Sequence, residues 1–92
     1  IVVSSPQAGD FINNQINLDF SVVTISQKLE RLEILWNDSL IDQALINENP
    51  ITYKKTLVVS GIEVQNKLSI RVINSQNSAF QKDIVLFGQT SL

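Results

Sequence analysis

The stretch "LERLEILWNDSLI", residues 29–41, decides the fold because it fits two kinds of secondary structure. Leu29, Leu32 and Trp36 recur at the spacing of a helix face, whereas Leu32, Ile34 and Trp36 alternate with other residues as in a β-strand. The Asn-Asp-Ser that follows Trp36 is typical of a turn, because these side chains compete for backbone hydrogen bonds inside a helix.

The helical alternative has support on its N-terminal side. Ile25 extends the helical spacing, Ser26 is a suitable N-cap, and several good helix formers follow. However, the other apolar segments of the chain need partners to bury their faces, and each buried large apolar side chain contributes about 1.5–3 kcal/mol. We therefore predict a strand that points Leu32, Ile34 and Trp36 inward.

Four other segments also have strand character. They are "QINLDFSV" at 15–22, "ITYKKTLVV" at 51–59, "LSIRVIN" at 68–74 and "AFQKDIVLFG" at 79–88, and the opening "IVV" adds a short β-branched run. Short alternating runs separated by turn signals are typical of a two-sheet antiparallel sandwich. The residues expected to share the core with the Leu32 strand are Ile16, Leu18, Phe20, Leu57, Ile70 and Val72.

Length and composition indicate one folded domain spanning residues 1–92, with 43% hydrophobic and 17% charged residues. A net charge of −2 and scattered basic residues argue against a nucleic-acid partner. No apolar run approaches the roughly 20 residues of a membrane span. Because the chain begins at Ile1 and has no Met, we expect it to be a piece of a longer protein.

The absence of Cys and His removes the usual zinc ligands, thiolate nucleophiles and general bases. We therefore expect a non-enzymatic domain without catalytic residues, metal or cofactor. The acidic residues considered as calcium ligands lack EF-hand spacing, which favours solvated carboxylates. They are Asp10, Asp19, Asp38, Asp42, Glu30 and Glu33.

Several segments resemble bacterial immunoglobulin-like modules. "IVVSSPQAGDFI" resembles their opening, a short strand followed by Ser-Pro, two variable residues and Gly. "LEILWNDSLID" is similar to their C–C′ hairpin, "NPITYKKTL" to strand E, and "NKLSIRVINSQNSAFQKDIVLF" to strands F and G. The chain departs from the pattern at Asp38, where Gly is usual, and in a long "QALINEN" connection. The resemblance implies an all-β, immunoglobulin-like antiparallel β-sandwich of about seven strands.

The resemblance also implies a setting. Such modules occur in exported bacterial surface proteins, often beside an enzyme such as a cell-wall glycosidase or a penicillin-binding protein. It therefore implies an extracytoplasmic accessory or spacer module, whose partners are neighbouring domains of the parent protein, a cell-wall polymer or another surface protein.

The last strand offers a candidate interaction surface. Ile84 and Leu86 alternate with Val85 and Phe87, so both faces of the strand are apolar. One apolar face is enough to fill the core, so the second face needs another explanation. We predict that Val85 and Phe87 form a surface that packs on a neighbouring domain. The alternative is an outer face that a local loop covers.

A second function, a carbohydrate-binding module, would use Trp36 and Tyr53 as an aromatic platform. The competing interpretation is that Trp36 lies in the core and that Tyr53 is half-buried at a sheet edge. A small subunit that completes an enzyme's active site is a third function class. Lys54-Lys55 is predicted to lie on an edge strand, where lysine discourages pairing between sheets.

Overall fold

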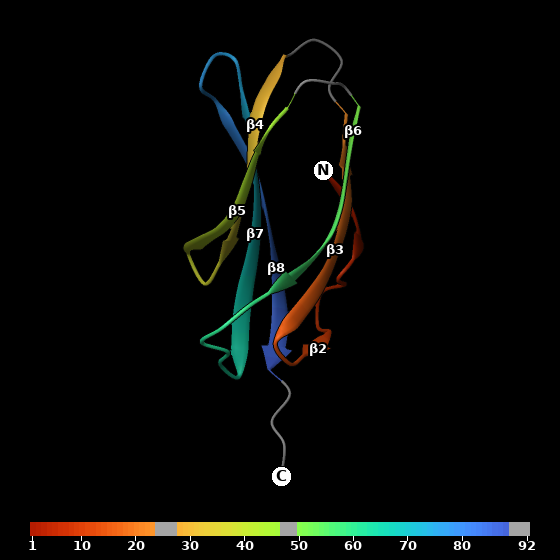
Figure 1. The fold of residues 1–92 in the computed structure, drawn as a ribbon, viewed down its shortest axis with the longest axis vertical. Coiled ribbons are helices and arrows are strands. Elements are labelled where there is room, and N and C mark those ends of the chain that lie inside the picture. The colour runs from red at the N-terminus through yellow and green to blue at the C-terminus, as the bar shows by residue number, and fades with distance from the viewer. Residues whose placement is uncertain (24–27, 47–49, 89–92) are drawn as a thin grey trace.

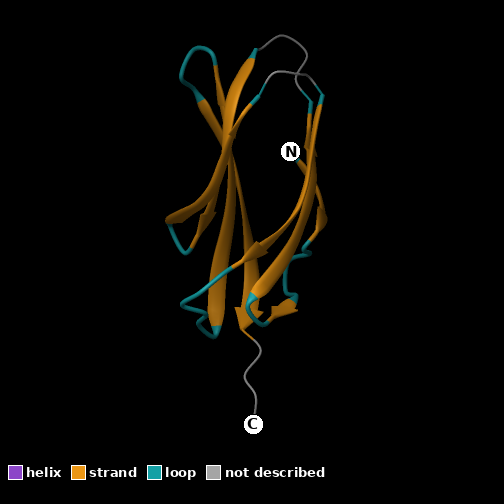
Figure 2. Ribbon diagram, viewed as in Figure 1, coloured by secondary structure: helices purple, strands orange, loops and turns teal. Residues whose placement is uncertain are grey.

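The computed structural model describes residues 1–23, 28–46 and 50–88, which form an all-β sandwich of eight strands in two sheets (Figure 2). The strands are β1 (Val2–Ser5), β2 (Phe11–Ile12), β3 (Gln15–Val22), β4 (Leu29–Trp36), β5 (Ser39–Leu45), β6 (Ile51–Val58), β7 (Gln65–Asn74) and β8 (Ala79–Gly88). Within these ranges, no helix of membrane-spanning length and hydropathy occurs.

The two sheets pack face to face in a long, narrow body of 49 × 21 × 17 Å (Figure 1). One sheet has three strands in the order β1-β3-β6, and the other has five in the order β2-β8-β7-β4-β5. The neighbouring strands pair antiparallel, except that β2 runs parallel to β8. The predicted all-β antiparallel sandwich is confirmed. The two-residue strand β2 is an addition that the sequence pattern does not predict.

The stretch at 29–41 is a β-hairpin, so the strand interpretation is confirmed and the helical alternative is wrong. Its turn consists of Asn37 and Asp38, with φ of 49° and 70°. Positive φ at both central residues defines a type I′ turn, which matches the twist of the flanking strands. Asn and Asp tolerate this conformation better than other non-glycine residues, so Asp38 can occupy the usual glycine position.

The connection after this hairpin is shorter than expected. Residues 43–45 of "QALINEN" are not loop but the end of β5, where their backbone pairs with Arg31, Leu32 and Glu33 of β4. The ladder to β4 satisfies backbone groups that a loop would leave to water. Of the remaining residues, Ile46 is buried, and residues 47–49, like the suggested N-cap Ser26, lie outside the described residues.

The core lies between the two sheets and confirms the predicted inward faces. Leu32, Ile34 and Trp36 are buried there. They share the core with Ile16, Leu18, Phe20, Leu57, Ile70 and Val72. Ile73, on the opposite face of β7 from Val72, is also buried, and β7 lies between β4 and β8 in the sheet.

The loop between β1 and β2 carries the chain from one sheet to the other. Gly9, at φ 90°, donates its N–H to the Val85 oxygen at 2.8 Å, and the Phe87 N–H donates to the Asp10 oxygen at 2.9 Å. Gly is suited to this position because its φ is positive. The Gly of the Ser-Pro-x-x-Gly opening therefore lies where the chain joins the edge of β8.

Candidate functional site

An apolar patch lies at the C-terminal end of β8, where Phe11 of β2 joins the two predicted residues. We call Phe11, Val85 and Phe87 the docking patch. Phe11 is 72% exposed and Val85 is 37% exposed. The rings of Phe11 and Phe87 are 5.8 Å apart between centroids and tilted by 37°. Large apolar side chains gathered at the surface are typical of interaction sites.

The opposite face of the same strand segment enters the core. Ile84 and Leu86 are buried. This placement agrees with the alternation of side chains along a strand. Val85 and Phe87 therefore lie on the outward face, as the interaction hypothesis requires.

Backbone contacts on both sides hold the end of β8 in place. Phe11 and Phe87 are in register, and the Gly88 N–H donates to the Val64 oxygen at 3.0 Å. A Cβ at position 88 would overlap the carbonyl oxygen of Glu63. Glycine is needed at position 88 because the backbone of the β6–β7 loop approaches it so closely. These backbone contacts hold the docking patch in a fixed position.

A second cluster, which we call the seam latch, joins the two sheets at their β5 and β6 edges. The hydroxyl of Tyr53 on β6 donates to Oδ2 of Asp42 on β5 at 2.6 Å. The ammonium of Lys55 lies 3.3 Å from the same oxygen. The Tyr53 ring stacks on Phe20, with centroids 5.0 Å apart. The latch therefore closes one side of the sandwich over the core.

The seam latch shifts the pKa values of its members. Burial alone raises the pKa of the Asp42 carboxyl, but the hydrogen bonds from Tyr53 and Lys55, with the charge of Lys55, bring it below its ordinary 3.8. Burial and the hydrogen bond to Asp42 raise the pKa of Tyr53 above its ordinary 10.0. The stabilisation from Asp42 is therefore present above pH 3.8 and is lost as pH falls through the lowered pKa. The stabilisation from Tyr53 is present below pH 10 and is lost at higher pH.

Tyr53→Phe keeps the stack on Phe20 and removes the hydrogen bond to Asp42. We expect the free energy of unfolding at neutral pH to fall by about 1–2 kcal/mol, because the lost hydrogen bond has a charged acceptor. The pKa of Asp42 should rise. Urea unfolding and a carboxyl NMR titration measure these two effects, with Lys54→Met as the control on the outer face of the same strand. An unchanged Asp42 titration would contradict the assignment.

The structure does not bring Trp36 and Tyr53 together on an exposed surface. Trp36 is 4% exposed, and its indole Nε1–H donates to the Ser60 oxygen at 3.1 Å. Tyr53 is half-buried in the seam latch. A sugar-stacking platform needs a ring face open to solvent, and the face of Trp36 packs inside the sandwich.

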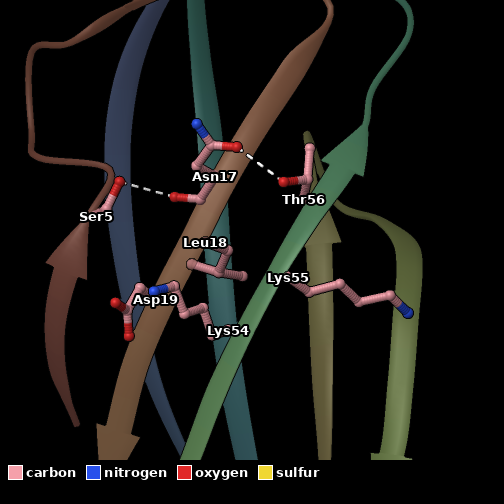
Figure 3. A pocket seen from close by; sticks show the side chains of 7 residues that line it. All are labelled: Ser5, Asn17, Leu18, Asp19, Lys54, Lys55 and Thr56. Atoms are coloured by element: carbon pink, nitrogen blue, oxygen red, sulfur yellow. Dashed lines mark hydrogen bonds between the residues drawn. The ribbon is translucent and has the colours of Figure 1, made fainter.

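A depression of about 310 Å³ lies on the outer face of the three-stranded sheet (Figure 3). The hydroxyl of Ser5 donates to the Asn17 backbone oxygen at 2.8 Å, and the hydroxyl of Thr56 donates to Asn17 Oδ1 at 2.9 Å. Its lining residues are Ser5, Asn17, Leu18, Asp19, Lys54, Lys55 and Thr56. Because none of these is aromatic, the depression offers no stacking surface, and the hydroxyls of Ser5 and Thr56 are both bonded to Asn17.

The acidic residues considered as metal ligands are spread over the molecule. Asp38 lies 2.7 Å from Lys67, and Glu33 lies 3.5 Å from Arg71. Asp42 belongs to the seam latch. In residues 1–23, 28–46 and 50–88, no three of the His, Cys, Asp and Glu side chains are grouped to hold a metal ion.

The two packed sheets and their strand order define the class of the domain by its fold, an immunoglobulin-like β-sandwich. A solved structure with this fold is a fibronectin(III)-like module of CbhA from Clostridium thermocellum. It superposes with a TM-score of 0.69 at 18% sequence identity, over 99% of this chain and 97% of that one. The chain's sequence matches no protein-family model and no curated protein.

Two features of these sites could not be found from the sequence. Phe11 follows the Gly-Asp of a loop, and only the crossover to the second sheet brings it against Phe87. Asp42 looked like one of several surface carboxylates, and only the approach of β6 gives it Tyr53 and Lys55 as partners. The signal available for Phe11 was that it is a large apolar residue in a polar segment.

Proposed function

We propose that this domain is a non-catalytic accessory module of a longer exported bacterial protein, and that it contacts a neighbouring domain through the docking patch. The observation that carries the proposal is the exposed ring of Phe11, packed beside the half-buried ring of Phe87 and next to the exposed Val85, on a strand whose other face already fills the core. Exposing such rings to water is unfavourable, and a partner surface would remove that cost.

The position of the docking patch suits contact with a domain that follows in the chain. Gly88, the last residue of β8, adjoins Phe87 and Ile12, and the described chain ends there at one tip of the long axis (Figure 1). A following domain on a short linker would be held close to this tip. The likeness in fold to a CbhA module supports the modular role by analogy of fold.

The experiment compares the isolated domain with the longest natural chain that contains it. Hydrogen exchange of the backbone amides around Phe11 and Phe87 should be several-fold slower in the longer chain, because the partner surface excludes water. Val85→Thr with Phe87→Lys should abolish that difference. The isolated double variant should remain folded, since both side chains lie on the outer face.

Ile84→Thr with Leu86→Thr is the matched control, because it alters the inward face of the same strand. This pair should destabilise the isolated domain by several kcal/mol, as expected for polar groups in a packed core. Equal exchange in the isolated and longer chains would refute the docking role. Unfolding by the outward pair, with tolerance of the inward pair, would show that the faces are reversed.

The alternative function, a carbohydrate-binding module with Trp36 and Tyr53 as its platform, draws no support from their positions. The buried indole and the hydrogen-bonded phenol would both have to leave their partners before a sugar could stack on them.

A further inference from the structure

Most of β8 has a free edge on the side away from β7. The short strand β2 pairs only with Phe87 and Gly88, and the preceding loop reaches no further back along β8 than Val85. In the described part of the chain, no strand pairs with the outer edge of residues 79–83. This segment is therefore an unpaired sheet edge.

The backbone groups at this edge can be identified from the contacts of β8. Val85 accepts and Phe87 donates a hydrogen bond on the β2 side, whereas Gly88 donates on the β7 side. Because backbone groups alternate in direction along a strand, those of Gln81 and Asp83 also point away from β7. The N–H and C=O groups of these two residues are thus available to an added strand.

An apolar pocket of about 200 Å³ adjoins the same edge, between the two sheets on the side opposite the seam latch. Two of its lining side chains are markedly exposed: Val23 at 65% and Phe80 at 45%. The remaining lining residues are Ile1, Val22, Leu29 and Val72. This apolar lining suits an aliphatic side chain entering from the edge of β8.

Lys82 lies between these two features. It shares the inward-facing parity of Phe80 and Ile84, but it is exposed because the edge is uncovered. No carboxylate of the described residues forms an ion pair with it. A lysine at such a position disfavours pairing with an added strand that has no negative charge. It favours pairing with a strand that places an acidic side chain beside the lysine.

We propose that the free edge at Gln81–Asp83 binds an extended peptide segment that carries an aliphatic and an acidic side chain two residues apart. The peptide backbone pairs with Gln81 and Asp83 and continues the line of β2. Its aliphatic side chain enters the pocket beside Phe80, and its carboxylate pairs with Lys82. This is strand addition to a sheet edge, in which the backbone supplies affinity and the alternate side chains supply specificity.

The test uses two synthetic peptides, Ac-Thr-Thr-Val-Thr-Glu-Thr-Thr-NH2 and the same composition with Val and Glu exchanged, since the added strand could run in either direction. Each is titrated into the 92-residue chain and followed by NMR shifts and amide hydrogen exchange. One order should bind, slow the exchange of the Gln81 and Asp83 amides, and weaken as salt is added.

A charge exchange provides the decisive comparison. Lys82→Glu should weaken binding of the Glu peptide at least about tenfold and should strengthen binding of a peptide with Lys in place of Glu. Lys54→Glu on the other sheet edge is the matched control and should leave binding unchanged. Gln81→Pro should abolish binding by removing an edge donor, and if that variant fails to fold, the charge exchange alone decides.

Three results would overturn the proposal. The first is that neither peptide order binds at millimolar concentration. The second is that Lys82→Glu and Lys54→Glu affect binding equally, which would indicate attraction by net charge only. The third is that the chain without peptide shows concentration-dependent shifts at residues 79–83, which would make a second copy of the domain the occupant of the edge.

Discussion

Replacing Ile34 by alanine is expected to lower the free energy of unfolding by about 2–5 kcal/mol. Ile34 is 0% exposed and lies in the middle of β4, opposite Ile70 of β7. The sheets are anchored by their hydrogen-bond ladders, so the core cannot collapse fully around the missing atoms. The loss of stability therefore includes the cost of a cavity in addition to the lost free energy of burying the side chain. Urea unfolding followed by tryptophan fluorescence measures it.

Leu40→Ala is the matched control for this substitution. Leu40 lies on β5, the neighbouring strand of the same hairpin, and is 50% exposed. Its loss should change the free energy of unfolding by less than about 1 kcal/mol, because much of its surface is already in water. Similar losses for both variants would mean that β4 does not face the core as described.

Replacing Asn66 by alanine is expected to cost about 2–4 kcal/mol, because it breaks a buried hydrogen-bond network. Asn66 Oδ1 accepts from the Glu63 N–H at 2.8 Å and from Asn37 Nδ2 at 3.1 Å, and its Nδ2 donates to the Glu63 oxygen at 2.9 Å. The network ties the β4–β5 turn to the β6–β7 loop. Thermal unfolding monitored by circular dichroism measures the change.

Gln65→Ala, at the exposed neighbouring position, serves as the control and should be close to neutral. A double-mutant cycle with Asn37→Ala should show coupling, since the two amides contact each other and Asn37 Oδ1 also accepts from the Lys67 N–H at 2.8 Å. Strict additivity of the two substitutions would show that the network does not act as a unit.

The sequence predicted the sheets well because half-buried strands carry their own signature. Phe20 and Ile70 lie in alternating runs, and both belong to the strand faces that fill the core. The ambiguous "LEILW" was resolved by the same logic, since the faces of the other strands required a partner. The Asn-Asp turn also followed from local chemistry, because these residues tolerate positive φ.

Contacts between distant segments could not be predicted in this way. Nothing local to Asp42 indicates that Tyr53 will approach it from the other sheet, and nothing local to Phe11 indicates Phe87. Both contacts depend on which edges of the sandwich meet, which is a property of topology. Lys82 is similar, because its position becomes informative only once the edge beside it is known to be free.

The parallel pairing of β2 with β8 has a consequence for how the chain can fold during synthesis. The last strand lies between β2 and β7, and it contributes Ile84 and Leu86 to the core. In a nascent chain that has not yet emerged past Gly88, β2 therefore lacks its partner strand and the core lacks these two side chains. With so many contacts between distant parts of the sequence, assembly should be slow and all-or-none. The module should thus remain unfolded on the ribosome until its final strand has left the exit tunnel.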